Sequence, residues 1–251
     1  MELNLGQKNA VITGATKGIG LAMLKQFATE GVNVAFCARS PDDVATTLAA
    51  MEGFGVRLLG SVVDVKDCEA YKRWLEEAAA WLGSVDIFVP NVSAGGGLNG
   101  ESSWHNNFEV DLMGAVRGCE ILAPHMSSGG SIVFISSTAA VENFIAPQAY
   151  NALKAALINY SKHLSQFYAP SGIRVNSVSP GPVLIEGGAW DEVRTALPEL
   201  YEETLGQIPI GRMGSAAEIA NVVVFLASSA ASFVTGTNVI VDGGMTRGVQ
   251  Y

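Results

Sequence analysis

Tyr150 and Lys154 stand four residues apart in a segment whose apolar pattern predicts a helix. Because residues i and i+4 lie on the same face of a helix, the Lys154 ammonium is expected beside the Tyr150 phenol. A neighbouring cation favours the phenolate form of a tyrosine, so this pair could give and take a proton. The spacing alone occurs in many helices, and it indicates acid–base chemistry only if the rest of the chain supplies a reaction partner.

A glycine-rich turn near the N-terminus supplies a second element. Residues 13–20 read Thr-Gly-Ala-Thr-Lys-Gly-Ile-Gly, after an apolar run and before a helical pattern. Glycines allow a sharp turn and let a phosphate approach the amides at a helix N-terminus. The first two glycines are further apart than in the common dinucleotide pattern, so an ordinary strand–helix turn is the alternative. A nicotinamide dinucleotide would unite the two elements, because its oxidised ring is a second positive charge near the phenol.

The composition limits the class of protein. The chain has 251 residues, of which 49% are hydrophobic and 16% charged, and a net charge of −9. These values predict one α/β domain, and the absence of a basic run argues against nucleic-acid binding. Cys37, Cys68 and Cys119 are too scattered for a metal site and odd in number for a disulfide framework, which favours a cytoplasmic protein. We expect no export signal and no membrane span, since no apolar run approaches the required length.

Short β-rich runs alternate with helical patterns along the whole chain. This alternation predicts a single-domain, doubly wound Rossmann fold over residues 1–251, with a seven-stranded parallel sheet and helices on both faces. The expected strands are residues 9–12, 33–37, 57–63, 87–90, 131–136, 174–179 and 238–241. Ligands bind beyond the carboxyl ends of such strands, where Thr13, Ala38, Asp64, Asn91, Ser137 and Pro180 fall. Residues 182–213 are expected to form a long irregular segment that acts as a lid.

Further motifs occur in a fixed order along the chain. They are Asp64-Val65, Ile135-Ser136-Ser137, Arg174 to Gly181, Gly211 to Gly214, Thr235-Gly236 and Asp242-Gly243-Gly244. With the glycine turn and the Tyr150/Lys154 pair, they make nearly the whole chain resemble the short-chain dehydrogenase/reductase (SDR) family, and within it the 3-oxoacyl-carrier-protein reductase-like members. The resemblance implies reversible, NADPH-dependent reduction of a ketone or 3-oxoacyl carbonyl to a secondary alcohol.

The resemblance also implies roles for individual residues. Tyr150 would donate the proton, Ser137 would hold the same substrate oxygen, and Lys154 would support the phenolate and bond the nicotinamide ribose. A turn cap is the alternative role for Ser137. Cofactor contacts would come from Gly14, Thr16, Lys17, Gly18, Ile19, Gly20, Arg39, Asp64, Val65, Asn91, Ser93, Tyr150, Lys154, Pro180, Gly181 and Val183.

The sequence departs from the family pattern at two places. The Asn-Asn-Ala-Gly motif after the fourth strand reads Pro-Asn-Val-Ser at residues 90–93. The asparagine that is the family's fourth catalytic residue is replaced by Asp111. By resemblance, Asp111 would act through its main-chain carbonyl, which holds a relay water to Lys154. Alternatively, its carboxylate is ionised near Lys154 and changes the charge balance around Tyr150.

The second strand predicts which cofactor is used. NAD-preferring family members commonly carry an acidic residue where Ala38 stands, to bond the ribose 2′-hydroxyl. Arg39 and Lys17 could instead bind a 2′-phosphate, which favours NADP(H) over NAD(H). The other interpretation is that both are ordinary surface cations.

Substrate and assembly are less strongly determined. Apolar candidates for the pocket wall favour a hydrophobic ketone or acyl chain, and they are Leu98, Phe144, Ile145, Leu184, Ile185 and Trp190. Two alternatives stay open, an NAD-linked sugar, polyol or alcohol dehydrogenase and a cofactor-binding regulator with an impaired site. The apolar helix predicted over residues 219–226 and the C-terminal strand and tail suggest a homotetramer.

Overall fold

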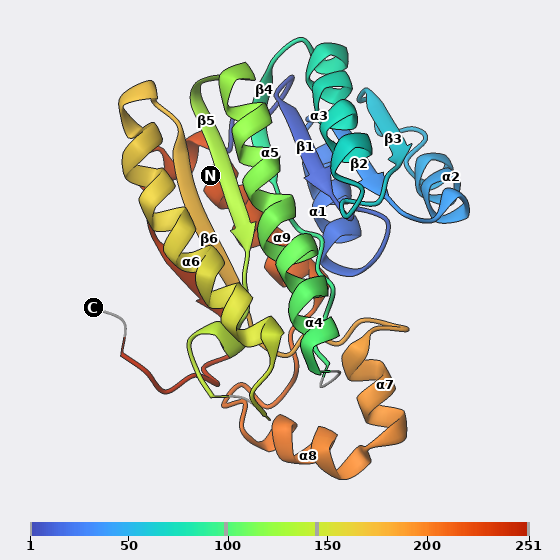
Figure 1. The fold of residues 1–251 in the computed structure, drawn as a ribbon, viewed down its shortest axis with the longest axis vertical. Coiled ribbons are helices and arrows are strands. Elements are labelled where there is room, and N and C mark those ends of the chain that lie inside the picture. The colour runs from blue at the N-terminus through green and yellow to red at the C-terminus, as the bar shows by residue number, and fades with distance from the viewer. Residues whose placement is uncertain (1, 98–99, 144–145, 250–251) are drawn as a thin grey trace.

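The computed structural model describes residues 2–97, 100–143 and 146–249. Within them, seven parallel strands form one sheet in the order β3-β2-β1-β4-β5-β6-β7 (Figure 1). The strands are β1 (Asn9–Thr13), β2 (Asn33–Ala38), β3 (Leu58–Val62), β4 (Val85–Val89), β5 (Met126–Ile135), β6 (Arg174–Pro180) and β7 (Asn238–Val241). Every residue of β1 and β6 is buried, as expected for parallel strands covered on both faces. The predicted fold class is confirmed.

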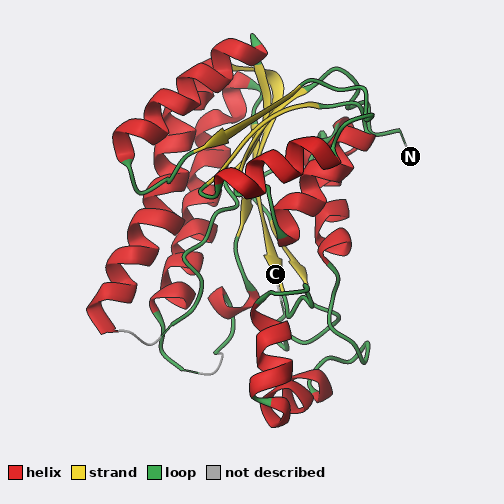
Figure 2. Ribbon diagram, turned by 90° about the vertical axis from the view of Figure 1, so that its right-hand side faces the viewer, coloured by secondary structure: helices red, strands yellow, loops and turns green. Residues whose placement is uncertain are grey.

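Helices cover both faces of the sheet, as Figures 1 and 2 show. One face carries α1 (Gly18–Thr29), α2 (Pro41–Ala50) and α9 (Ala216–Ala227), and the other carries α3 (Cys68–Leu82), α5 (Gly114–Leu122) and α6 (Ala149–Tyr168). Each set of helices encloses a hydrophobic core against its face of the sheet, and alternate strand residues point into the two cores. Ile12 packs with the first set of helices and Val11 with the second. The strand order reverses between β1 and β4, which places a crevice at their carboxyl ends.

The remaining elements lie at both edges of the sheet. They are α4 (Gly100–Asn107), the π-helical segment η1 (Phe108–Met113), the 3₁₀ turns η2 (Ala123–His125), η3 (Thr138–Ala140), η4 (Ala169–Ser171) and η5 (Ser229–Ala231), and the helices α7 (Ala189–Ala196) and α8 (Pro198–Gly206). Of these, α4, η1, η3, α7 and α8 lie on the side of the carboxyl ends. Figure 1 shows α7 and α8 beyond the strand ends, apart from the sheet.

The lid segment, residues 182–213, is not irregular as predicted, because it contains α7 and α8. Pro198 is the first residue of α8, a position where its missing N–H costs no helical hydrogen bond. The Asp191 carboxylate accepts a hydrogen bond from the Gly187 amide at the start of α7. No side chain of α7 is buried, so this helix is only loosely attached to the rest of the molecule.

Arg174 fastens β6 to α9. Its guanidinium is buried and donates hydrogen bonds to the main-chain carbonyls of Leu226 at 2.6 Å, Ala227 at 3.2 Å and Ser228 at 3.0 Å. A cation at a helix C-terminus satisfies carbonyls that have no partner within the helix. The strand that carries Pro180 at its end is therefore held firmly against the helix behind it.

The described residues contain three free cysteines, and burial raises the pKa of the Cys37 thiol to about 12. Within the same residues, no His, Cys, Asp and Glu side chains gather in a group that could hold a metal ion. A search of the described helices finds none with the length and apolarity that a membrane span requires.

Gly20 is required by a close approach between α1 and the turn that precedes it. A Cβ atom at this position would lie 1.9 Å from the Gly14 carbonyl oxygen and 2.7 Å from the Asn91 side-chain nitrogen. The first of these neighbours is backbone and cannot rotate away. Only glycine therefore allows the helix to begin this close to the end of β1.

We predict that Gly20→Ala lowers the free energy of unfolding by about 1–3 kcal/mol, the usual cost of overpacking, and weakens binding of the expected dinucleotide at this turn. Urea unfolding and cofactor fluorescence measure the two effects. Gly206→Ala is the control, because a Cβ there meets no atom within 4 Å and its φ is not positive. Equal unfolding midpoints for the two variants would show that the turn can relax around a methyl group.

Candidate active site

Two cavities lie side by side at the carboxyl edge of the sheet and share Asn91 and Ser93. The outer cavity, of about 400 Å³, is lined by the predicted residues Gly14, Thr16, Lys17, Arg39, Asp64 and Val65. The inner cavity, of about 430 Å³, is lined by the predicted residues Ile19, Ser137, Tyr150, Lys154, Pro180, Gly181 and Val183. Of the other predicted residues, Gly18 and Gly20 form the turn beside the cavities, and Asp111 is buried behind Lys154.

The outer cavity and the glycine turn fit a dinucleotide. Lys17 is the N-cap residue of α1 but makes no side-chain capping bond, so the first amides of the helix remain available to an anion. The Asn91 side chain donates hydrogen bonds to the carbonyls of Thr13 at 3.0 Å and Gly14 at 2.9 Å. Asn91 therefore holds the ends of β1 and β4 together at the reversal of strand order.

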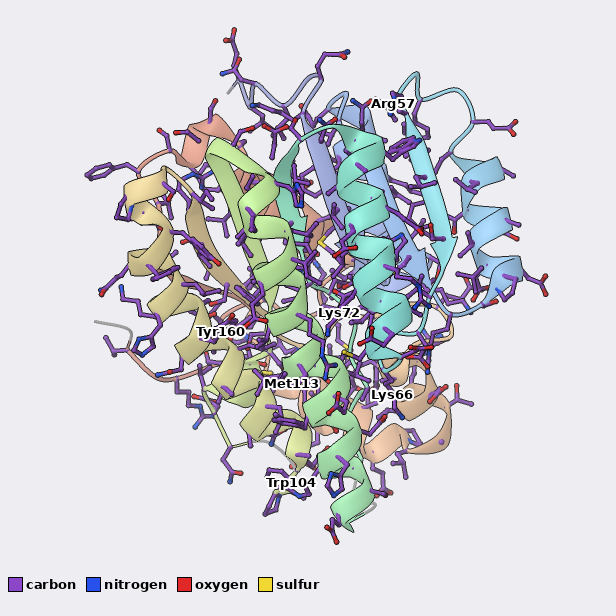
Figure 3. The ribbon with its side chains drawn as sticks, turned by 45° about the horizontal axis from the view of Figure 1, so that its top comes forward. Arg57, Lys66, Lys72, Trp104, Met113 and Tyr160 are labelled. Carbon is purple, nitrogen blue, oxygen red and sulfur yellow. The ribbon has the colours of Figure 1, made fainter. Side chains whose placement is uncertain are left out.

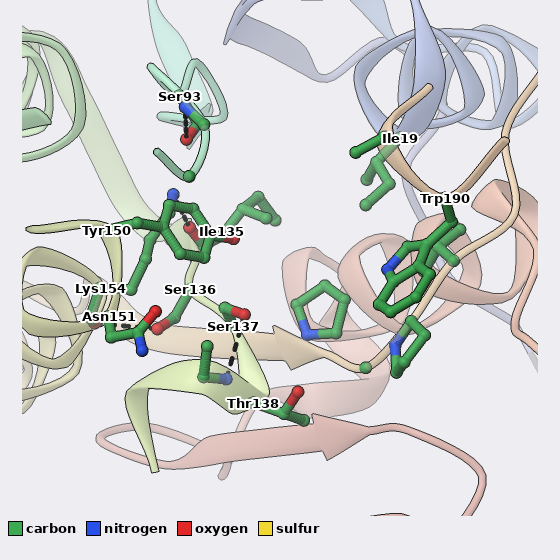
Figure 4. Close-up of a pocket in the computed structure, with 18 of the residues that line it drawn as sticks. Ile19, Ser93, Ile135, Ser136, Ser137, Thr138, Tyr150, Asn151, Lys154 and Trp190 are labelled. Carbon is green, nitrogen blue, oxygen red and sulfur yellow. Dashed lines mark hydrogen bonds between the residues drawn. The ribbon is translucent and has the colours of Figure 1, made fainter. Parts of the chain in front are cut away.

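Ser137, Tyr150 and Lys154 meet at the inner cavity, although they come from different elements (Figure 4). Ser137 follows β5, and its hydroxyl accepts a hydrogen bond from the Ala139 amide at 3.2 Å. It is thus a turn cap that also faces the cavity. Ser136 differs, because it is buried and donates to the Lys154 carbonyl at 2.9 Å. Lys154 lies one turn after Tyr150 on α6, with its Nζ 5.6 Å from the phenol ring centroid.

Lys154 is almost completely buried, with 2% of its surface exposed. Its Nζ donates to the Ile135 carbonyl at 2.9 Å and lies 3.1 Å from Oδ1 of Asp111, whose side chain is fully buried. An ammonium has three N–H donors, so one direction remains for the cavity. A charge buried this deeply is stable only when it is paired, which makes Asp111 the counter-ion of Lys154.

The second oxygen of Asp111 is also engaged. Its Oδ2 accepts hydrogen bonds from the Ala94 amide and the Asn107 side chain, both at 3.0 Å. Asn107 in turn donates to the Gly95 carbonyl at 3.0 Å. The carboxylate thus joins η1 to the loop after β4 as well as to α6. This geometry supports the second of the two roles considered for Asp111, because the side chain itself contacts Lys154.

The cations of the outer cavity differ from each other. Lys17 forms an ion pair with Asp43 of α2 at 2.8 Å, and this hydrogen bond lowers the pKa of the Asp43 carboxyl. Arg39 is exposed and forms no ion pair with any residue that the structure describes. A phosphate in this cavity would meet Arg39 directly, whereas Lys17 would be shared with a carboxylate.

The Pro-Asn-Val-Ser departure has a modest structural effect. Pro90 lies just beyond the end of β4, so its missing N–H removes no bond from within the strand. The Ser93 hydroxyl accepts a hydrogen bond from the Gly95 amide at 3.0 Å and lies at the boundary of the two cavities. The position that is glycine in the family therefore carries a hydroxyl group here.

Of the predicted pocket wall, Ile185 and Trp190 line the inner cavity. Leu184 does not, and its amide bonds the Gly214 carbonyl. Leu98, Phe144 and Ile145 lie outside the described residues. Sequence reasoning did not single out Thr138, Gln148 and Asn151, which also line the cavity. Their positions beside Ser137 and Tyr150 in the chain were the available signal.

Comparisons with known proteins agree with this site. The family model described as enoyl-(acyl carrier protein) reductase matches residues 14–246. An isoepoxydon dehydrogenase of Penicillium expansum is 41% identical over the whole of both chains. The chain belongs to the short-chain dehydrogenase/reductase family. Among other SDR proteins, a 3beta-hydroxysteroid dehydrogenase of Eggerthella lenta is 34% identical over 97% of this chain and 95% of its own.

The structure of one SDR enzyme is particularly informative. L-Sorbose reductase of Gluconobacter frateurii, solved with NADPH and L-sorbose, is similar to this chain with a TM-score of 0.90 and 33% identity. The similarity covers 99% of this chain and 100% of the reductase. The sheet and helices described above therefore match an SDR fold across their full extent, and this chain is an oxidoreductase of that family that acts on a carbonyl or alcohol group.

Proposed function

We propose that this protein catalyses the reversible, NADPH-dependent reduction of a ketone to a secondary alcohol. The observation that carries the proposal is the meeting of Ser137, Tyr150 and Lys154 at one cavity that adjoins the cavity lined by the glycine turn. The cofactor supplies the hydride when bound. The protein supplies the proton, the placement of the carbonyl and the exclusion of water.

Each residue has a distinct part in the proton transfer. The Tyr150 hydroxyl gives its proton to the carbonyl oxygen as negative charge develops there, and its phenolate takes the proton back in alcohol oxidation. The Ser137 hydroxyl donates a hydrogen bond to the same oxygen and fixes its position. The Lys154 cation, held by Asp111 and the Ile135 carbonyl, stabilises the phenolate between proton transfers.

The preference for NADP(H) rests on the outer cavity. Ala38 offers no carboxylate to a ribose 2′-hydroxyl, and Arg39 is an unpaired cation among the described residues. The similar L-sorbose reductase was solved with NADPH. Lys17 contributes less to binding of the 2′-phosphate than its charge suggests, because the Asp43 carboxylate competes with the phosphate for the Lys17 ammonium.

Assembly and location complete the proposal. We infer a homotetramer, because α9 is apolar beyond its buried face, with Val222 and Phe225 only partly covered. A second chain that packs on this helix and on β7 would cover them. The three free cysteines support a reducing, cytoplasmic environment.

Tyr150→Phe tests the proposed proton donor. The change removes one hydroxyl and leaves the ring in place, so NADPH binding and folding should be retained while kcat for ketone reduction falls by about a hundredfold or more. Stopped-flow or steady-state absorbance of NADPH measures the rate, and fluorescence titration measures binding. Turnover at the wild-type rate would show that another group donates the proton.

Arg39→Ala tests the cofactor preference. Loss of a hydrogen bond to a charged group should weaken NADPH binding by about 1.5–3 kcal/mol and leave NADH binding almost unchanged. Dissociation constants for both cofactors measure the effect. Arg57→Ala is the control, because Arg57 (Figure 3) stacks on Trp81 and lines neither cavity. An equal loss for NADPH and NADH would contradict a role in binding the 2′-phosphate.

A further inference from the structure

We infer that the substrate is a compact ketone with a second oxygen substituent close to its reacting carbonyl, and that the Gln148 side-chain amide recognises this oxygen. The inference rests on the proposed function and adds the class of substrate to it. It gives Gln148 a role in substrate specificity, and the motif analysis assigned no role to this residue.

The inner cavity is lined by both apolar and polar side chains (Figure 4). The apolar ones come from Ile19, Val183, Ile185 and the lid residues Trp190 and Val193. Most of the cavity surface is apolar, but polar side chains also reach it, from Ser93, Ser137, Thr138, Gln148, Tyr150 and Asn151. Only Ser137 and Tyr150 are needed to bind a carbonyl oxygen, so the cavity has more polar groups than a simple ketone can use.

Gln148 is held in one orientation. It is the N-cap residue of α6, yet its side chain makes no capping bond and turns instead toward the loop after β4. There its Oε1 accepts a hydrogen bond from the Gly97 amide at 3.0 Å. A Cβ atom on residue 96 would lie 2.7 Å from Oε1, so glycine at that position leaves room for this contact. Because a backbone N–H needs an acceptor, the amide oxygen must face the loop.

The other end of the Gln148 amide is therefore available to a ligand. Its Nε2 donates no hydrogen bond to any residue in the described parts of the chain, and Gln148 lines the cavity two residues before Tyr150. The Ser93 and Thr138 hydroxyls likewise donate to no described residue. All three groups are donors, so they fit a ligand that presents oxygen acceptors near the carbonyl.

The cost of leaving these donors unpaired disfavours a long alkyl chain that lies against them. A ligand that displaces water from a polar wall without replacing its hydrogen bonds loses affinity, and a site built to bond a hydroxyl rejects the analogue that lacks it. The cavity of about 430 Å³ must also admit the nicotinamide, so little room remains for a long substrate. The apolar acyl chain favoured by the sequence is the poorer fit.

Gln148→Glu tests the inference with a minimal change. Glutamate keeps an oxygen for the Gly97 amide but replaces the Nε2 donor with an acceptor. We would measure kcat/KM with NADPH for 2-hydroxycyclohexanone, 3-hydroxycyclohexanone and cyclohexanone, which share one ring. Of the two hydroxylated ketones, we take the one with the higher kcat/KM in the wild type. The ratio of its kcat/KM to that of cyclohexanone should fall about tenfold or more in the variant. Gln166→Glu is the control, because Gln166 is exposed on the same helix.

The outcomes separate the inference from the proposed function. A wild-type enzyme whose kcat/KM for cyclohexanone equals that for both hydroxylated ketones would overturn the inference while upholding the proposed reductase activity. This result needs no variant. A preference that Gln148→Glu leaves unchanged would also overturn it. Reduction of no ketone in a broad panel, with either cofactor, would instead refute the proposed function.

Discussion

The ion pair between Lys154 and Asp111 is the constraint on which the site depends. It lies behind the cavity that Tyr150 and Ser137 line, with neither side chain open to solvent. A buried pair offers little net stability, yet loss of one partner leaves an unpaired buried charge, which commonly costs about 3–5 kcal/mol. The arrangement is therefore fixed once the chain has folded. Tyr150 precedes Lys154 by one turn of α6, so an anchored lysine also fixes the position of the phenol.

The pair also ties together segments that no single element connects. Asp111 belongs to η1, a π-helical segment of the kind often found at functional sites. Its carboxylate bonds the loop after β4 through Ala94, and Asn107 extends the same network to Gly95. That loop carries Ser93 between the two cavities, and its Gly97 amide donates a hydrogen bond to the Gln148 side chain. One carboxylate thus links the proposed acid–base pair to the loop that lines the inner cavity.

The sequence was sufficient for the features that depend on local pattern. Parallel strands buried on both faces appear as short apolar runs, and their carboxyl ends meet at one edge, so Thr13, Asn91 and Ser137 could be placed near one another without coordinates. Helix α7 was not predicted, although its residues are amphipathic, because it has only eight residues and directly follows Gly187-Gly188. It is instead defined by contacts with α8 and the cavity.

Pairings between distant residues were equally inaccessible to the sequence. Nothing local indicates that Lys17 meets Asp43 or that Gln148 turns away from its own helix. The family resemblance placed Asp111 near Lys154 but left open whether its carboxylate makes the contact. The spacing of Asn107 and Asp111 was visible, since residues four apart share a helix face, but its meaning required the buried partner. Each of these contacts arises from tertiary packing between segments that are separate in the chain.

The central claim is that the Asp111 carboxylate, and not only its main chain, sets the charge around Tyr150 and Lys154. The most direct test is the pH dependence of alcohol oxidation in Asp111→Asn, the direction in which Tyr150 is the proposed base. Asn107 and the Ala94 amide do not titrate, so the charged and titratable groups in the described network are Asp111, Lys154 and Tyr150. Removal of one negative charge lets the coupled tyrosine and lysine lose a proton more easily. The account predicts that the rising limb of the rate profile moves to lower pH by about one unit or more. Profiles that superimpose for the wild type and the variant would contradict it.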